Sequence, residues 1–142
     1  MAWQYLDLAD FLLIAEAVLD LPAEDLSRAG RLELADSALH APAAEFGGVE
    51  FYPDLARKTA VLAARLIRNH PLPDGNKRVG YLCALEFVAR NGASWAYPPD
   101  DPEGDETVAI IEGVAAGDVD EDELCDWVAS RSWWKSSTGR SS

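Results

Sequence analysis

The segment His70-Pro-Leu-Pro-Asp-Gly-Asn-Lys-Arg78 carries the side chains best suited to chemistry. Its two prolines require a loop, and a helix is expected to begin near Gly75. The first turn of a helix presents unpaired backbone N–H groups and a partial positive charge, so it attracts phosphate and other anions. Gly75 removes the Cβ that would keep a phosphate from the backbone, and Asp74 stands at the expected N-cap. His70, across the loop, is placed to accept a proton from an attacking hydroxyl.

Lys77 and Arg78 are unusual residues for the start of a helix. Cations there oppose the helix dipole at a cost of roughly 0.3–1 kcal/mol each. A bound polyphosphate reverses that sign, and Asp74 could hold a Mg²⁺ ion that bridges the phosphates. The segment therefore indicates phosphoryl or nucleotidyl transfer. Taken singly, its residues also fit structural roles: His at a helix end, Asp-Gly in a turn, Asn-Lys-Arg at the surface.

The chain is acidic, with a formal net charge of −13 and a pI near 4.3, which argues against general nucleic-acid binding. Half of its 12 Lys and Arg residues nevertheless lie between positions 57 and 78, where Asp74 is the single acidic residue. Four of them are expected to form the solvated face of a helix: Arg57, Lys58, Arg65 and Arg68. That explanation does not extend to Lys77 and Arg78.

The sequence has no sign of a membrane or an oxidising compartment. No apolar run approaches the length of a membrane-spanning helix, and the N-terminal segment resembles a first helix more than a signal peptide. Cys83 and Cys125 form no Cys-x-x-Cys pair. We therefore expect a cytoplasmic protein that has no zinc or redox site and binds no membrane.

Hydrophobic periodicity predicts a compact all-α domain of about six helices over residues 1–134, with a flexible tail at 135–142. The main helices are expected at 6–18, 31–40, 54–69, 75–90, 106–116 and 120–133. Residues 97–105 are acidic and proline-rich, which is typical of a loop. Ahead of the helix at 54–69, apolar and polar residues alternate around a Gly-Gly pair, which predicts a small β-hairpin flap. The flap consists of Phe46, Gly47, Gly48, Val49, Glu50 and Phe51.

The motif at 70–78 resembles the signature of the Fic/Doc superfamily, His-x-Phe-x-Asp/Glu-Gly/Ala-Asn-x-Arg, and Arg68-Asn69 ahead of it also fits. The flap resembles that of the Doc (death-on-curing) branch. The similarity covers roughly residues 30–95. It implies a compact helical fold and an enzyme that uses ATP to modify a hydroxyl group on a target protein.

Carried over position by position, the resemblance implies a role for each motif residue. His70 would be the base that activates the target hydroxyl, and Asp74 would coordinate Mg²⁺. Gly75 and Asn76 would form an anion hole, and Arg78 would hold phosphates.

Departures from the family pattern bear on the product. Lys77 stands where AMP-transferring members usually have Gly and the Doc branch has Lys. It implies transfer of the γ-phosphate of ATP to a Ser or Thr of a target such as elongation factor Tu. Tyr81 stands where many AMP-transferring members have a second Arg, which favours the same product. Leu72 replaces the motif Phe and would still anchor the loop in the core. The flap, residues 46–51, would dock the target.

The chain contains no Ser/Thr-x-x-x-Glu-Gly/Asn motif of the kind with which some members block their own site. The resemblance therefore implies a separate antitoxin chain as the restraint. Two alternatives stay open at this point: an AMP-transferring Fic enzyme, and a catalytically silent binding module that keeps the fold.

Overall fold

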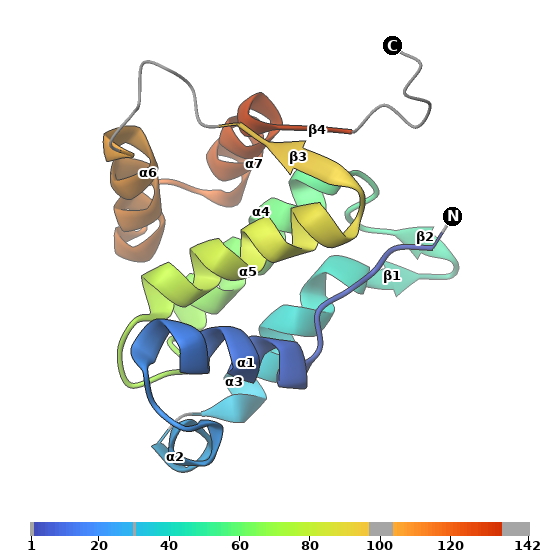
Figure 1. The fold of residues 1–142 in the computed structure, drawn as a ribbon. Coiled ribbons are helices and arrows are strands. Elements are labelled where there is room, and N and C mark those ends of the chain that lie inside the picture. Colours follow the sequence, from blue (N-terminus) through green and yellow to red (C-terminus); the bar gives the residue numbers. More distant parts are fainter. Residues whose placement is uncertain (1, 30, 97–103, 135–142) are drawn as a thin grey trace.

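The computed structural model describes residues 2–29, 31–96 and 104–134. Within them, seven α-helices, one 3-10 turn and two short antiparallel ribbons follow one another along the chain (Figure 1). Their bounds are α1 Leu8–Leu19, α2 Ala23–Ala29, α3 Leu32–His40, η1 Ala41–Ala43, β1 Glu45–Phe46, β2 Val49–Glu50, α4 Leu55–Asn69, α5 Asn76–Arg90, β3 Ala93–Trp95, α6 Asp105–Ala116, α7 Glu121–Arg131 and β4 Ser132–Trp134. The predicted all-helical fold with a small hairpin is confirmed. None of the described helices is long and apolar enough to cross a membrane.

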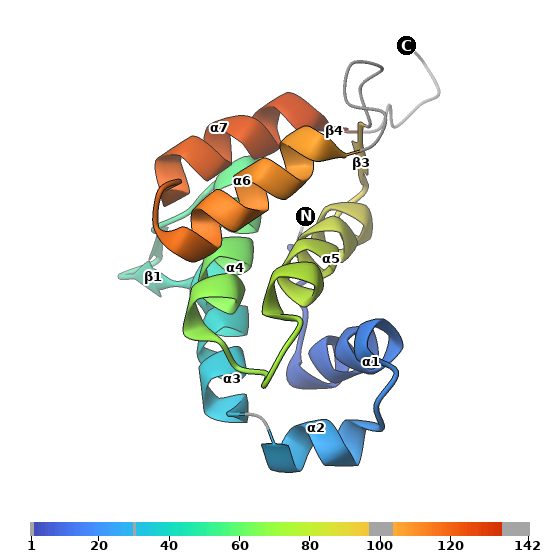
Figure 2. The same ribbon diagram turned by 90° about the vertical axis from the view of Figure 1, so that its left-hand side faces the viewer.

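Helices α4 and α5 form the centre of the molecule and run side by side in opposite directions (Figure 2). One apolar cluster joins them to α1, α2 and α3, and a second joins them to α6 and α7. The close approach of α4 and α5 depends on Gly80, because a Cβ at this position would lie 2.7 Å from Cγ1 of Ile67. The loop between these two helices holds the predicted catalytic segment, so the core fixes both of its ends.

The helix starts follow local signals in the sequence. Asp7 caps α1 and Asp120 caps α7, each in a reciprocal capping box with an acidic residue three positions on. Asp54 caps α4 by accepting a hydrogen bond from the Arg57 backbone N–H over 2.8 Å. Each of these caps satisfies a backbone N–H group of its own first turn.

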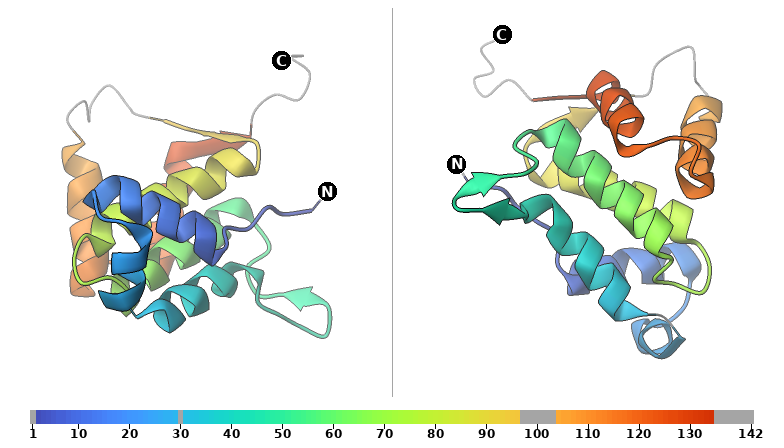
Figure 3. Two further views of the ribbon diagram at one scale, coloured as in Figure 1. Left: turned by 60° about the horizontal axis from the view of Figure 1, so that its bottom comes forward. Right: turned by 180° about the vertical axis from the view of Figure 1, so that it is seen from behind.

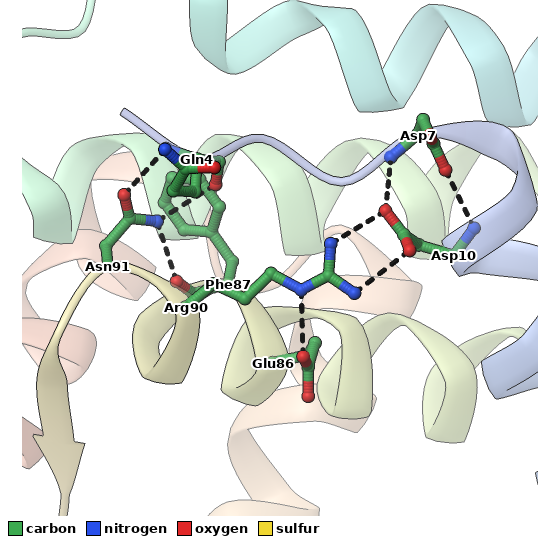
Figure 4. A network of polar contacts seen from close by, with 7 residues as sticks. All are labelled: Gln4, Asp7, Asp10, Glu86, Phe87, Arg90 and Asn91. Carbon is green, nitrogen blue, oxygen red and sulfur yellow. Dashed lines mark hydrogen bonds and ion pairs between the residues drawn. The ribbon is translucent and has the colours of Figure 1, made fainter. Parts of the chain in front are cut away.

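The N-terminal part of α1 is clamped to the end of α5 (Figure 4). Both oxygens of Asp10 accept hydrogen bonds from the Arg90 guanidinium, over 2.8 and 2.9 Å. Glu86 accepts a third from Nε of Arg90. The Asn91 side chain exchanges two hydrogen bonds with the backbone of Gln4. The N-terminal segment is therefore held along α5.

The predicted helix at 120–133 is wrong at its end. Helix α7 stops at Arg131, and Ser132–Trp134 forms β4, which pairs with β3 in an antiparallel register. The two aromatic residues at its end suit a strand, and Trp134 packs against Trp3 with ring centroids 6.0 Å apart. This pairing joins segments far apart in the chain, so no local pattern reveals it. The predicted loop at 97–105 and the tail at 135–142 lie almost wholly outside the described residues.

Of the four cations of α4 that were predicted to form a solvated face, Arg68 is exposed, Arg57 and Arg65 are half-buried, and Lys58 does not reach solvent. Lys58 is fully buried. Arg57 and Arg65 instead pair with Asp122 and Glu121 of α7. Arg68 donates to the backbone carbonyls of Val114 and Val119. The prediction is wrong for Lys58 and holds only in part for Arg57 and Arg65, because these three side chains pair with carboxylates of the flap and of α7.

Candidate functional site

The candidate site is the loop between α4 and α5. At its first residue, His70, the backbone turns out of α4 in the left-handed region, with φ of 48°. Only one other non-glycine residue of the described chain, Asp20, has a positive φ. A side chain in this conformation costs of the order of 1 kcal/mol, although His tolerates it better than most residues. The turn directs the chain away from the α4 axis immediately before Pro71.

Gly75, rather than Asp74, is the N-cap of α5. Its φ is 77°, and a Cβ there would lie 2.4 Å from Cδ2 of Leu19 at the end of α1. Both the backbone conformation and the packing therefore require glycine. The prediction of Asp74 as the cap is wrong by one residue, because the left-handed turn at Gly75 takes the capping position. Helix α5 consequently begins without a side-chain cap, and its first-turn N–H groups need another acceptor.

Asp74 itself is exposed, and no other described residue forms a hydrogen bond or ion pair with its carboxylate. No group of three or more His, Cys, Asp or Glu side chains suited to a metal occurs among the described residues. A metal at this loop would therefore be held by Asp74 together with oxygens of a bound ligand. That is the coordination that Mg²⁺ adopts with phosphates.

Asn76 holds the loop together from within. Its side chain is 8% exposed. Its Oδ1 accepts a hydrogen bond from the Leu72 N–H, and its Nδ2 donates to the Leu72 carbonyl, each over 2.9 Å. Nδ2 also lies 3.4 Å from Nδ1 of His70, a long contact in which the amide can only donate. The side chain of Asn76 is thus committed to the loop, which leaves its backbone N–H for an anion.

The motif also contains a buried apolar residue, Leu72, and two exposed cations, Lys77 and Arg78. Leu72 is 4% exposed and belongs to the apolar cluster around α1 and α3. Lys77 and Arg78 lie in the first turn of α5 and are exposed. Lys77 Nζ is 4.0 Å from Oε2 of Glu112 on α6, and both side chains are more than half exposed, so this pair contributes little.

Arg31 belongs to the same site and was missed by the sequence prediction. A cavity of about 350 Å³ is lined by Arg31, His70, Pro71, Leu72 and Pro73. The Arg31 backbone N–H donates to the Pro71 carbonyl over 2.7 Å, which joins the start of α3 to the loop. The sequence does show Arg31 directly ahead of a predicted helix. No local pattern, however, connects Arg31 with the loop at residues 70–75, about 40 positions later.

The predicted flap is confirmed as the β1–β2 hairpin, which projects from the helical body (Figure 3). Gly47 and Gly48 both have positive φ, as a tight two-residue hairpin turn requires. Phe46, Val49 and Phe51 are 79%, 69% and 58% exposed. Three large apolar side chains therefore face solvent on one small hairpin.

Lys58 connects this flap with the core. Its ammonium donates to the Tyr5 hydroxyl and the Pro42 carbonyl, each over 2.9 Å, and to Glu50 of β2 over 2.6 Å. It also lies 5.1 Å from the centroid of the Trp3 ring. Burial acts to lower the pKa of Lys58, but the hydrogen bonds to Glu50 and Tyr5 outweigh it and raise the pKa above its ordinary value. Lys58 therefore stays charged and holds three segments together.

Known proteins resemble this chain over the segments that form the site. The family model described as the Fic/DOC family matches residues 5–88. That range includes the flap, α4, the whole motif and all but the last two residues of α5. A protein of Mycolicibacterium smegmatis named Toxin Doc is 38% identical over 91 residues, which are 64% of this chain and 68% of that protein.

Proposed function

Because this chain belongs to the Fic/DOC family, we propose that it is a Doc-like toxin that transfers the γ-phosphate of ATP to a Ser or Thr hydroxyl of a target protein. A separate antitoxin chain restrains it. The observation that carries the proposal is the uncapped start of α5, with Lys77 and Arg78 in its first turn and His70 across the loop. This arrangement suits the polyphosphate of a nucleotide together with a hydroxyl that must lose its proton.

Several groups of the chain would bind different parts of the ATP polyphosphate and its metal ion. The backbone N–H groups at Gly75 and Asn76 would bind phosphate oxygens, and the Arg78 guanidinium would add a charged donor of two parallel hydrogen bonds. Asp74 would hold a Mg²⁺ ion, which would supply positive charge to the phosphate oxygens during transfer. Asn76 keeps the loop in shape through its two hydrogen bonds with Leu72.

The transfer itself needs one base. His70 accepts the proton of the target hydroxyl as the hydroxyl oxygen bonds to the γ-phosphorus. The bond from this phosphorus to the bridging oxygen breaks, and ADP leaves with the electron pair. His70 lies at the left-handed turn that ends α4 and is exposed, so its ring is accessible to a substrate.

Two residues favour γ-phosphate transfer over AMP transfer. Lys77 adds charge and bulk in the first turn of α5, where an AMP-transferring pose would need room for its phosphates. Tyr81, at the place of the second arginine of many AMP-transferring relatives, packs edge-on against Trp95 with centroids 6.2 Å apart. It supplies no cation. AMP transfer remains the second candidate because the rest of the motif serves both reactions.

We further propose that the flap docks the target protein. Its exposed Phe46, Val49 and Phe51 offer an apolar surface beside two backbone strands that are two residues long. Elongation factor Tu is the first target to test. Such a target and ATP as cosubstrate both place the proposed activity in the cytoplasm.

The test incubates the protein with elongation factor Tu and ATP labelled at either the α- or the γ-phosphate. Label on the target from γ-labelled ATP alone is expected. Label from the α position would replace the kinase proposal by AMP transfer. His70→Ala is expected to abolish transfer and growth inhibition. His40→Ala is the matched control, because His40 is the chain's other histidine and lies exposed at the end of α3.

Transfer and toxicity that persist in His70→Ala would contradict the role of His70 as the base in either reaction. A wild-type protein that binds ATP and target but transfers neither label would favour the silent binding module. Co-expression with the chain of a neighbouring antitoxin gene is expected to restore growth.

A further inference from the structure

We propose that Arg31 is a phosphate-binding residue of the His70 cavity, supplied from outside the motif by the start of α3. The proposal rests on the proposed use of ATP and adds one residue to the site. Arg31 and His70 line the same cavity of about 350 Å³. The ligand class is the phosphate oxyanion of a nucleoside triphosphate.

The first argument is the pairing of the arginines. The chain has 25 acidic and 12 basic residues, so carboxylates outnumber the cations with which they could form ion pairs. Five described arginines form ion pairs with carboxylates: Arg28, Arg57, Arg65, Arg90 and Arg131. Arg68 donates instead to two backbone carbonyls. Within the described part of the chain, only the guanidinium groups of Arg31 and Arg78 have no protein partner.

Both of these arginines adjoin the same loop. Arg78 lies in the first turn of α5, immediately after the loop, and Arg31 precedes α3, whose start lies beside the loop (Figures 2 and 3). The bond from the Arg31 N–H to the Pro71 carbonyl fixes the backbone of Arg31 next to the residue that follows His70. Both guanidinium groups that have no protein partner in the described chain therefore belong to residues that adjoin the loop between α4 and α5.

The second argument is the position of Arg31 on its helix. It is the N-cap of α3 and provides no side-chain cap. A cation at this end of a helix opposes the dipole, with a cost of roughly 0.3–1 kcal/mol, as do Lys77 and Arg78 at the start of α5. A phosphate in the cavity removes that cost, because it accepts two parallel hydrogen bonds from one guanidinium. One bound polyphosphate would therefore offset the unfavourable cation–dipole interaction at the starts of both α3 and α5.

The test compares binding of Mg²⁺-ATP, tripolyphosphate and adenosine to the full chain by calorimetry. Arg31→Ala is expected to weaken ATP and tripolyphosphate binding by about tenfold or more, which corresponds to a lost charge-assisted hydrogen bond. Adenosine binding stays unchanged. Arg31→Lys, which keeps the charge but not the paired donors, is expected to restore only part of the loss. Arg28→Ala is the matched control, since Arg28 lies three residues earlier and pairs with Asp25.

The outcomes separate this proposal from the proposed function. Wild type that binds ATP, with Arg31→Ala binding tripolyphosphate equally well, overturns the Arg31 proposal alone. A variant that binds ATP normally but needs more target protein for half-maximal transfer also overturns it, because Arg31 then contacts an acidic group of the target. Wild type that binds neither ATP nor tripolyphosphate overturns the proposed function as well. Equal thermal unfolding of the variants checks that they fold alike.

Discussion

Lys58 Nζ lies 2.6 Å from Oε1 of Glu50, and this ion pair joins a fully buried residue of α4 to the projecting flap. The flap has few other links to the body. The hydrogen bond from the Phe51 N–H to the Ala44 carbonyl, over 3.0 Å, lies within the hairpin and extends its ladder at the base. The apolar side chains of the flap point to solvent. The position of the flap therefore depends strongly on one charged contact with the core.

Replacing Glu50 by Gln should loosen the flap, because a neutral amide makes a weaker hydrogen bond with a buried ammonium than a carboxylate does. We expect the flap amides to exchange with solvent roughly threefold to tenfold faster, relative to amides of α5, as a bond worth about 1 kcal/mol is lost. Glu45→Gln is the control. Glu45 is the direct cross-strand partner of Glu50, so this substitution removes the same charge from the same hairpin. Equal exchange in both variants would show that the ion pair does not position the flap.

Local signals explain how much of this molecule could be predicted from its sequence. The Gly47-Gly48 pair specifies its own turn, and Asp7 and Asp54 specify the starts of their helices, because each acts on residues next to it. The order of helix, loop and helix around His70 follows from prolines and periodicity in the same way. These features place the candidate site at the α4–α5 junction before any tertiary contact is known.

The features that sequence reasoning missed are long-range ones. The burial of Lys58 depends on Tyr5 and Pro42, which meet it only in the folded chain. Arg31 joins the site through a hydrogen bond to Pro71, and β3 pairs with β4 across two intervening helices. The sequence alone predicts that a cation on a helix faces solvent, and only tertiary packing can show that it is buried.

Asn76→Ala should destabilise the protein by about 2–4 kcal/mol, because the N–H and the carbonyl of buried Leu72 both lose their partner. Urea unfolding measures the change. Asn91→Ala is a matched comparison, since Asn91 makes the same two-way exchange with the Gln4 backbone at an exposed position, where water can replace it. The loss at Asn91 is expected to be clearly smaller. A similar loss at both positions would contradict the role of Asn76 as the loop's internal support.

The Asp10–Arg90 clamp should make stability depend on pH in the acid range. The hydrogen bond from Arg90 lowers the pKa of Asp10 below its ordinary value of 3.8. The unfolded chain therefore binds this proton first as the pH falls, so the stability from the clamp is complete above about pH 4 and is lost as the pH falls through the lower, folded-state value.

Unfolding free energies of wild type and Asp10→Asn, measured from pH 6 down to pH 2.5, should differ most at pH 6 and converge at the acid end. Arg90→Met should remove the same pH-dependent part, because Asp10 then titrates without its partner. A difference between wild type and Asp10→Asn that is constant over the range would contradict the clamp.

His70 should limit stability while it serves the proposed reaction, because its φ of 48° suits glycine better than a residue with a Cβ. We expect His70→Gly to be more stable than His70→Ala by about 0.5–1 kcal/mol, with both variants inactive in phosphate transfer. Asp20 offers the matched comparison, since it ends α1 in the same left-handed conformation, with φ of 55°. Asp20→Gly and Asp20→Ala should show the same order of stability and keep activity. If His70→Ala were the more stable of its pair while the Asp20 variants kept the expected order, the contacts of the residue-70 side chain, rather than its backbone, would govern stability at the site.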